Sequence, residues 1–243
     1  MSSTRFRTDE LEAIAYDFWR SPEVAELDGW RLRFAHGVSG RANSVWPNAD
    51  GLLPLDEKID RAEKWYRSRG VFVLFQLTEA ARPAGLEDAL VARGYVQRVA
   101  PVSVQVASVD DVLARTRGDA ALSATLDDAW VKLWAGTRRF ENLDAARAIL
   151  TDGTVAFARI GDVAVGRGSA VGDWLGITAM ATLPEARRRG HARAVVHALA
   201  DWGASQGCRY AMVQVDSANE AAMALYADAG FAPHHEYRYR LLR

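Results

Sequence analysis

The spacing of hydrophobic residues changes along the second half of the chain. Residues 153–186 contain three apolar runs separated by two Gly-Asp dipeptides, which favour tight hairpin turns. After Pro184 the apolar residues of 192–202 recur at helical spacing, as on one face of a helix. The pattern therefore predicts three consecutive strands and then a helix that stops at Gly207.

Three more elements complete this half. Residues 209–215 are expected to form a strand, and residues 217–230 a helix that Ser217 or Asn219 would cap. Residues 236–242 are expected to form the last strand. Hairpins that lead into a helix, a strand and a second helix predict the α/β (α+β) fold class, with a mixed sheet.

The first half repeats part of this pattern. Residues 62–96 resemble residues 199–232, because each segment has a Trp five positions before a Gly. A second Gly follows 24 positions later in the first segment and 23 later in the second. Similar spacing arises in any helix–strand–helix unit with glycine stops, so a chance likeness remains the alternative to two copies of one fold.

The two segments differ where polar residues and glycine would matter most. Each such feature of the second segment is missing from the first. The first copy is therefore predicted to keep the fold and to lack the functional site. The aligned pairs are Arg187 and Asp50, Gly190 and Leu53, Ala192 and Leu55, Asn219 and Pro83, and Tyr226 and Leu90.

A boundary between the two copies is expected within residues 107–119, which predicts domains of residues 1–107 and 108–243. Residues 122–150 are expected to form two helices. The strand-like residues 99–107 are expected to end the first sheet and to begin the second.

Composition narrows the class of protein. Of 243 residues 49% are hydrophobic and 25% charged, as in globular proteins with a real core. The net charge of -1 favours neither nucleic acid nor an anionic membrane as a partner. The single cysteine, Cys208, is expected to be a small buried residue, and no internal disulfide is possible. The N-terminal residues lack the apolar run of a signal peptide, so a cytoplasmic location is expected. As a separate expectation, the protein is a monomer or homodimer.

The stretch "LPEARRRGHARA" (183–194) ends a predicted strand and begins the predicted helix. The first N–H groups of a helix lack internal partners and carry partial positive charge. Gly190 would let an anion reach them, because it has no Cβ, and Ala192 keeps the same surface open. One glycine after hairpins does not fit a dinucleotide fingerprint, and no Gly-Lys-Ser/Thr follows as in a kinase loop.

Asn219 and Tyr226 lie seven residues apart, which places them on one face of the last predicted helix. The amide could hold a ligand, and the hydroxyl could give up a proton. The alternative is structural: Asn219 caps the helix and Tyr226 packs on Phe231.

Residues 178–231 resemble the GCN5-related N-acetyltransferases (GNAT). They carry the family's Arg/Gln-x-x-Gly-x-Gly/Ala loop and its later Asn…Ala…Leu-Tyr…Gly-Phe signature. The first half resembles only a degenerate copy, as in tandem members of the family. The matching residues are Arg187, Gly190, Ala192, Asn219, Ala222, Leu225, Tyr226, Gly230 and Phe231.

The resemblance implies two GNAT-like mixed sheets flanked by helices, with strands that splay apart at an acetyl-CoA site in the second copy. A backbone N–H near Thr182 would stabilise the oxyanion, and Tyr226 would be the catalytic acid. The chain departs from the usual pattern at Thr182, where a bulky aliphatic residue is common, and at Ala192, where glycine is. The implied cofactor-binding residues are Met180, Ala181, Thr182, Arg187, Arg188, Arg189, Gly190, His191, Ala192 and Asn219.

The resemblance implies a primary amine as acceptor, and a small molecule is expected. An amine of a protein or peptide is the first alternative, and a non-catalytic CoA-binding sensor the second. The polar run 41–44 of the first half either faces the acceptor or lies on a solvated hairpin. No cluster has metal-ligand spacing, so no metal is predicted. The general base stays open among Glu141, Asp173, Glu185, His234, His235 and Glu236.

Overall fold

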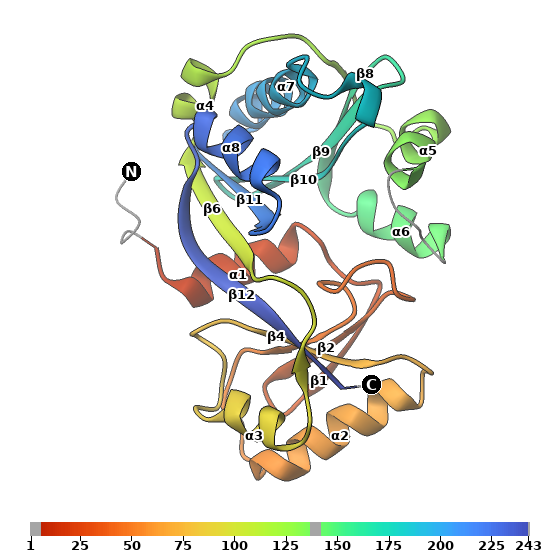
Figure 1. Cartoon of the computed structure of the whole chain (residues 1–243), viewed down its shortest axis with the longest axis vertical. Coiled ribbons are helices and arrows are strands. Elements are labelled where there is room, and N and C mark those ends of the chain that lie inside the picture. Colours follow the sequence, from red (N-terminus) through yellow and green to blue (C-terminus); the bar gives the residue numbers. More distant parts are fainter. Residues whose placement is uncertain (1–5, 137–141, 243) are drawn as a thin grey trace. The chain divides into compact units, whose positions relative to one another are not determined.

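The computed structural model describes residues 6–136 and 142–242, and these residues divide into two compact units (Figure 1). Each unit gathers segments from both halves of the chain. The predicted domains 1–107 and 108–243 remain a prediction. Unit 1 holds residues 6–18, 103–136 and 150–234, and unit 2 holds residues 19–102, 142–149 and 235–242.

Unit 1 is built on a mixed sheet with the strand order β6-β11-β10-β9-β8-β7. β10 runs parallel to β11 and antiparallel to β9, so the three strands predicted over residues 153–186 are confirmed as a meander. The strands are β6 (Val102–Ser108), β7 (Ala121–Ser123), β8 (Thr154–Ile160), β9 (Ala164–Val171), β10 (Trp174–Thr182) and β11 (Tyr210–Asp216).

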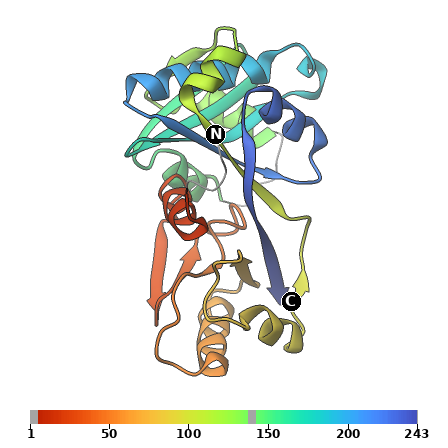
Figure 2. The same ribbon diagram turned by 90° about the vertical axis from the view of Figure 1, so that its left-hand side faces the viewer.

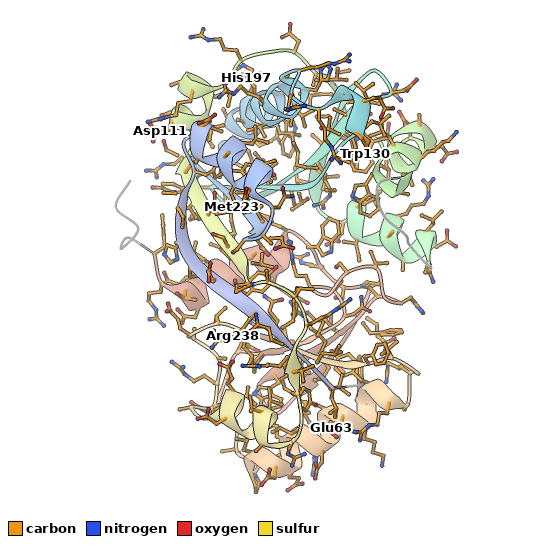
Figure 3. All side chains as sticks on the ribbon, viewed as in Figure 1. Glu63, Asp111, Trp130, His197, Met223 and Arg238 are labelled. Atoms are coloured by element: carbon orange, nitrogen blue, oxygen red, sulfur yellow. The ribbon has the colours of Figure 1, made fainter. Side chains whose placement is uncertain are left out.

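The helices of unit 1 cover this sheet through apolar faces. Val195 and Leu199 of α7 pack in one core with Ile177 of β10, which confirms the predicted helical spacing. Helix α4 lies in the segment predicted to hold the boundary, and Thr116 after it hydrogen-bonds His197 of α7 at 3.0 Å (Figure 3). The helices are α1 (Thr8–Asp17), α4 (Val109–Arg115), α5 (Asp128–Gly136), η2 (Pro184–Ala186), α7 (His191–Ser205) and α8 (Glu220–Asp228).

Unit 2 has a second mixed sheet with the order β1-β2-β3-β4-β12, and β5 pairs with β12. Ile59 and Tyr66 of α2 pack with Trp30 and Phe75 of this sheet, and α2 and α3 are the orange and dark-yellow helices of Figure 2. The elements are β1 (Glu23–Leu27), β2 (Trp30–Phe34), β3 (Val45–Pro47), α2 (Leu55–Arg67), β4 (Val73–Leu77), α3 (Leu86–Ala92), β5 (Val96–Gln97), α6 (Leu143–Leu150) and β12 (Ala232–Leu242).

The two units share one topology. Three antiparallel strands lead through a helix to a parallel strand and a second helix, first as β1-β2-β3-α2-β4-α3 and then as β8-β9-β10-α7-β11-α8. The strand beyond β4 is β12, from the end of the chain, and the strand beyond β11 is β6, which follows the first copy. The internal repeat predicted from glycine spacing is therefore a repeat of fold, completed in each unit by a strand from the other half.

Candidate functional site

Strand β10 is distorted just before its end. Its antiparallel register with β9 shifts between Thr178 and Ala181, and Ala179 has a φ of +52°. A bulge of this kind turns backbone groups out of the regular ladder, and a left-handed alanine is an unfavourable conformation that the surrounding fold must hold. The distortion adjoins Met180, Ala181 and Thr182, which are among the predicted cofactor-binding residues.

A buried arginine holds the strand at this point. Arg167 is completely buried and lies opposite Thr178 in the β9–β10 ladder. Its Nη1 donates to Thr178 Oγ1 at 3.3 Å and to the Phe18 carbonyl at 2.8 Å, and its Nε donates to the Leu150 carbonyl at 2.6 Å. The guanidinium thus ties the strand before the bulge to two neighbouring segments of unit 1.

Strands β10 and β11 separate at the same level. Their parallel ladder runs from Trp174 and Tyr210 to Ile177 and Val213 and ends there, although both strands continue. Backbone groups on this side of the last five residues of β10 therefore have no partner in the β10–β11 ladder. The predicted splaying of the two strands is confirmed.

The basic loop turns sharply into α7. Arg188 has a φ of +60° and Gly190, the N-cap residue, a φ of +82°. A Cβ added to Gly190 would meet no other atom within 4 Å, so the space beside this backbone is open. Two left-handed residues around a helix N-terminus aim successive N–H groups at one point, which is the geometry of an anion site. The exposed side chains of Arg187, Arg188 and Arg189 add positive charge around it.

The next helix carries the other two predicted residues. Asn219 is the N-cap of α8, and its Oδ1 accepts the N–H of Ala222 at 3.1 Å, as the structural alternative supposed. Tyr226 is buried and packs edge-to-face on Phe231, with ring centres 5.7 Å apart. Because the cap uses Oδ1 of Asn219, its amide nitrogen is the group that is left to bind a ligand.

The topology brings these residues to one edge of the unit 1 sheet. Because β10 and β11 are parallel neighbours, the starts of α7 and α8 follow the same ends of the two strands. Within the loop, Arg187 Nε donates to the Thr182 carbonyl at 3.4 Å and thereby joins the helix entry to the end of β10. The two helix starts that the sequence pattern singled out therefore lie at the same edge of the unit 1 sheet.

The candidate bases are scattered. Asp173 lies in the β9–β10 turn, at the end of β10 away from Thr182, and Glu185 is exposed in η2. Nε2 of His234 hydrogen-bonds the Phe6 carbonyl at 3.0 Å, while His235 is buried. Glu236 is exposed on β12. Glu141 lies outside the described residues, and the base stays open.

In the first copy the corresponding loop holds an anion of the protein itself. The carboxylate of Asp28, in the β1–β2 turn, accepts the N–H groups of Leu52 and Leu53 at 2.9 Å each. These two hydrogen bonds hold the pKa of Asp28 below its ordinary value. Leu53 aligns with Gly190, so the amides aligned with the predicted phosphate-binding ones are already satisfied. Asp28 was missed, because an Asp-Gly turn gives no hint of a partner 24 residues later.

A buried lysine closes this loop from the other side. Lys58 of α2 donates to the carbonyls of Ala49 at 3.3 Å and Asp50 at 2.8 Å, and its Nζ lies 3.6 Å from Asp28. It also stands 4.4 Å from the centre of the Trp30 ring. Burial lowers the pKa of Lys58, and the Asp28 carboxylate opposes that shift. The first copy thus uses a fixed ion pair where the second has an open loop.

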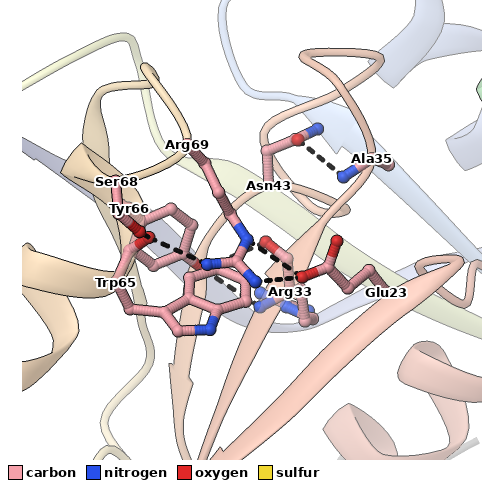
Figure 4. A network of polar contacts seen from close by, with 8 residues as sticks. All are labelled: Glu23, Arg33, Ala35, Asn43, Trp65, Tyr66, Ser68 and Arg69. Carbon is pink, nitrogen blue, oxygen red and sulfur yellow. Dashed lines mark hydrogen bonds and ion pairs between the residues drawn. The ribbon is translucent and has the colours of Figure 1, made fainter.

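Residues 42–44 of the polar run in the first half are buried and Arg41 is half-buried, so the interpretation of this run as a solvated hairpin is wrong. Arg33 and Ser44 are almost completely enclosed, and Arg33 Nη2 donates to Ser44 Oγ at 2.6 Å and to Gln76 Oε1 at 3.0 Å. The Tyr66 hydroxyl donates to the Arg33 carbonyl at 3.0 Å (Figure 4). This network is internal to unit 2.

Two other features of the described residues bear on the class of protein. Cys208 is buried and free, as predicted, and burial raises the pKa of its thiol to about 11. Over the described ranges, no helix is long and apolar enough to cross a bilayer.

Solved structures with this architecture include GCN5-related N-acetyltransferases. The chain matches a GCN5-related N-acetyltransferase from Kribbella flavida with a TM-score of 0.68 and 17% identity, over 98% of this chain and 96% of that one. It matches a tandem GNAT protein from the clavulanic acid biosynthesis pathway with a TM-score of 0.59 and 14% identity, over 100% and 89%. The fold is therefore that of the GNAT proteins, in its tandem form.

Sequence comparison gives the particular family. The chain belongs to the family described as "Probable histone acetyltransferase Rv0428c C-terminal", whose model matches residues 7–240. It is 30% identical to the probable histone acetyltransferase Rv0428c of Mycobacterium tuberculosis, over 94% of this chain and 72% of that protein. It is 27% identical to the uncharacterized N-acetyltransferase YobR of Bacillus subtilis, over 96% and 98%. The chain is thus an acetyltransferase of GNAT type.

Proposed function

We propose that this chain moves an acetyl group from acetyl-CoA to the primary amine of a small molecule. The observation that carries the proposal is the left-handed turn at Arg188 and Gly190, at the edge where β10 and β11 separate. Open backbone amides at a helix start fit a pyrophosphate, and a strand that is unpaired on one side fits an extended chain of amides. The described residues therefore fit the cofactor.

The chain's own groups have separate roles in this proposal. Amides from Arg188 to Ala192 hold phosphate, and the backbone of Met180 to Thr182 pairs with the pantetheine arm. When bound, acetyl-CoA supplies an activated acetyl thioester. A backbone N–H near Thr182 polarises its carbonyl, and Asn219 Nδ2 orients the arm.

Tyr226 supplies the proton. Its burial against Phe231 fixes the ring, so the hydroxyl can be held at one position from which it protonates the departing thiolate. A positioned acid of this kind contributes roughly 100-fold or more to turnover. The aligned residue of the first copy, Leu90, is buried and has no such proton.

A protein acceptor is the second candidate, because the relative from Mycobacterium tuberculosis is named a probable histone acetyltransferase. The net charge of -1 and the lack of a long acidic tract favour a small amine over a lysine-rich tail. A CoA-binding sensor is the third candidate, and it would bind the cofactor without turnover.

One experiment separates the three candidates. Release of free CoA from acetyl-CoA is measured with a panel of small primary amines and, in parallel, with lysine-rich histone-tail peptides. We expect release with at least one small amine and none above background with the peptides. Release with peptides alone would assign a protein acceptor. Binding of acetyl-CoA, seen as a raised melting temperature, without release in either set would assign a sensor.

A further inference from the structure

Unit 2 contains a half-buried guanidinium, that of Arg41, in which two buried nitrogens lack hydrogen-bond partners among the described residues. Arg41 lies in the loop 35–44 between β2 and β3, and its Nε and Nη1 are buried with no hydrogen-bond partner among the described residues. The guanidinium stands 5.9 Å from the centre of the Trp19 ring, which is a cation–π contact and leaves the N–H groups unpaired. Buried donors of a charged group nearly always have an acceptor, so this one requires an explanation.

The loop around Arg41 is firmly held, so a loose loop is not the explanation. Asn43 Oδ1 accepts the N–H of Ala35 at 2.8 Å (Figure 4). It also accepts the N–H of Gly37 at 3.0 Å. Asn43 Nδ2 donates to the Ser39 carbonyl at 2.7 Å. These bonds fix the backbone on both sides of Arg41 and hence the origin of its side chain.

The residue before Arg41 is fixed as well. A Cβ added to Gly40 would lie 3.0 Å from Cζ of Tyr239, so the loop passes directly over that ring. The carbonyl of Ala42 accepts the Ser21 hydroxyl at 2.9 Å. A side chain at residue 40 would crowd this ring, so the backbone next to Arg41 lies close to Tyr239. The Arg41 guanidinium acts electrostatically on the Tyr239 hydroxyl.

Neighbouring polar groups are committed to other partners. Nη2 of Arg33 donates to Ser44 Oγ and to Gln76 Oε1, so these two acceptors are engaged. Trp19 Nε1 donates to Ser39 Oγ at 3.0 Å. Burial raises the pKa of Tyr239, and the Arg41 and Arg33 guanidiniums oppose this shift, so Tyr239 stays a neutral hydroxyl beside two cations. The surroundings of Arg41 are rigid, cationic and partly aromatic.

We propose that Arg41 anchors a binding site for the carboxylate group of a small organic acid, with Trp19 and Tyr239 beside it. A carboxylate is an acceptor only, and its single negative charge matches the single guanidinium that has no hydrogen-bond partner here. A phosphate dianion would bring a second charge, for which the described residues offer no second open cation at this loop. The site belongs to unit 2 and does not rest on the proposed acetyl transfer.

The test uses the full chain and two readouts. Sodium acetate and sodium benzoate are titrated at constant ionic strength, with acetamide and benzamide as neutral counterparts and inorganic phosphate as the dianion. We expect a saturable rise in melting temperature with the carboxylates alone, together with a downfield shift of one arginine Nε–H signal in the ¹⁵N–¹H spectrum. No saturable change, or an equal response to phosphate, would overturn the proposal.

Variants assign the response to Arg41. We expect Arg41→Gln to abolish both effects while the ligand-free melting temperature stays the same or rises, because a half-buried charge with unpaired donors is removed. Arg31→Gln, which removes a half-exposed arginine paired with Glu26 in the same unit, is the matched control and should keep both effects. A large fall in stability in both Arg41→Gln and Arg41→Lys would make Arg41 a structural residue and would refute the site.

Discussion

The carboxylate of Asp28 accepts the backbone N–H of Leu53 at 2.9 Å, at the position of the first copy that aligns with Gly190 of the second. An internal anion therefore occupies the amides of one copy, while a left-handed glycine leaves those of the other open. The same loop architecture thus serves two ends. In unit 2 the loop is held closed by Asp28 and Lys58 and has a structural role. In unit 1 we propose that the corresponding loop binds a cofactor phosphate.

This relationship predicts the effect of Asp28→Asn. The neutral amide should accept the N–H groups of Leu52 and Leu53 less strongly, so the thermal midpoint at pH 7 should fall by a few degrees. Because the pKa of Asp28 is lowered in the folded chain, its contribution is present above the unfolded pKa and is lost as pH falls through the folded one. The gap between wild type and variant should therefore close in acid.

Calorimetric melting between pH 7 and pH 3 checks this expectation. Asp162→Asn, in the corresponding turn of the second copy, is the control and should leave the midpoint near that of the wild type. A gap that stays constant over the whole pH range would contradict the role of the Asp28 charge.

The closed loop of the first copy also predicts the stoichiometry of cofactor binding. Titration calorimetry should give one acetyl-CoA per chain, and a stoichiometry of two would mean that the loop of the first copy is open to the cofactor.

Gly190→Leu should abolish binding of acetyl-CoA. A side chain at this φ of +82° costs about 1–2 kcal/mol in backbone strain and fills the space beside the amides. Gly207→Leu is a close control, because Gly207 has a φ of +84° and equally open surroundings after the other end of α7. Both variants should lose similar stability, and only Gly190→Leu should lose the cofactor-induced rise in melting temperature. Equal binding by the two variants would remove the loop from the site.

Tyr226→Phe should reduce turnover of an identified amine by roughly 100-fold or more and leave the affinity for acetyl-CoA nearly unchanged. The ring packing on Phe231 survives this change, so the melting temperature should move little. Tyr95→Phe removes a buried hydroxyl that donates to Glu63 in unit 2 and should not slow turnover. Turnover is measured by release of free CoA. An unaffected rate in Tyr226→Phe would show that this residue is not the acid.

Glu87→Gln should make unit 2 less sensitive to acid. Two arginines of β12, Arg238 and Arg240, bind the Glu87 carboxylate and lower its pKa to about 2. The group therefore stabilises the fold fully above its ordinary pKa of about 4.5 and loses that contribution as pH falls toward 2. Denaturant midpoints at pH 7, 4 and 2.5 should show a gap between wild type and variant that shrinks in this order. Glu57→Gln, at an exposed pair with Arg61, should show a smaller effect.

Local patterns in the sequence were enough for the elements and for the segments that make up the candidate site. Hairpin dipeptides, helical spacing and glycine stops predicted β8 to β10, α7, β11 and α8, because these signals depend on neighbours within a few residues. The Arg-x-x-Gly-x-Ala loop and the Asn…Tyr spacing identified both helix entries for the same reason.

Tertiary structure decided what depends on distant partners. Residues far apart in the chain meet in the Asp28–Leu53 hydrogen bond, in the Arg167–Phe18 hydrogen bond, and in the exchange of β6 and β12 between the sheets. The burial of Arg33, and of two nitrogens of Arg41, likewise follows from the packing of unit 2 and not from their polar neighbours in sequence. Periodicity encodes which face of an element is apolar, whereas the partner of a polar group is fixed only when the chain closes around it.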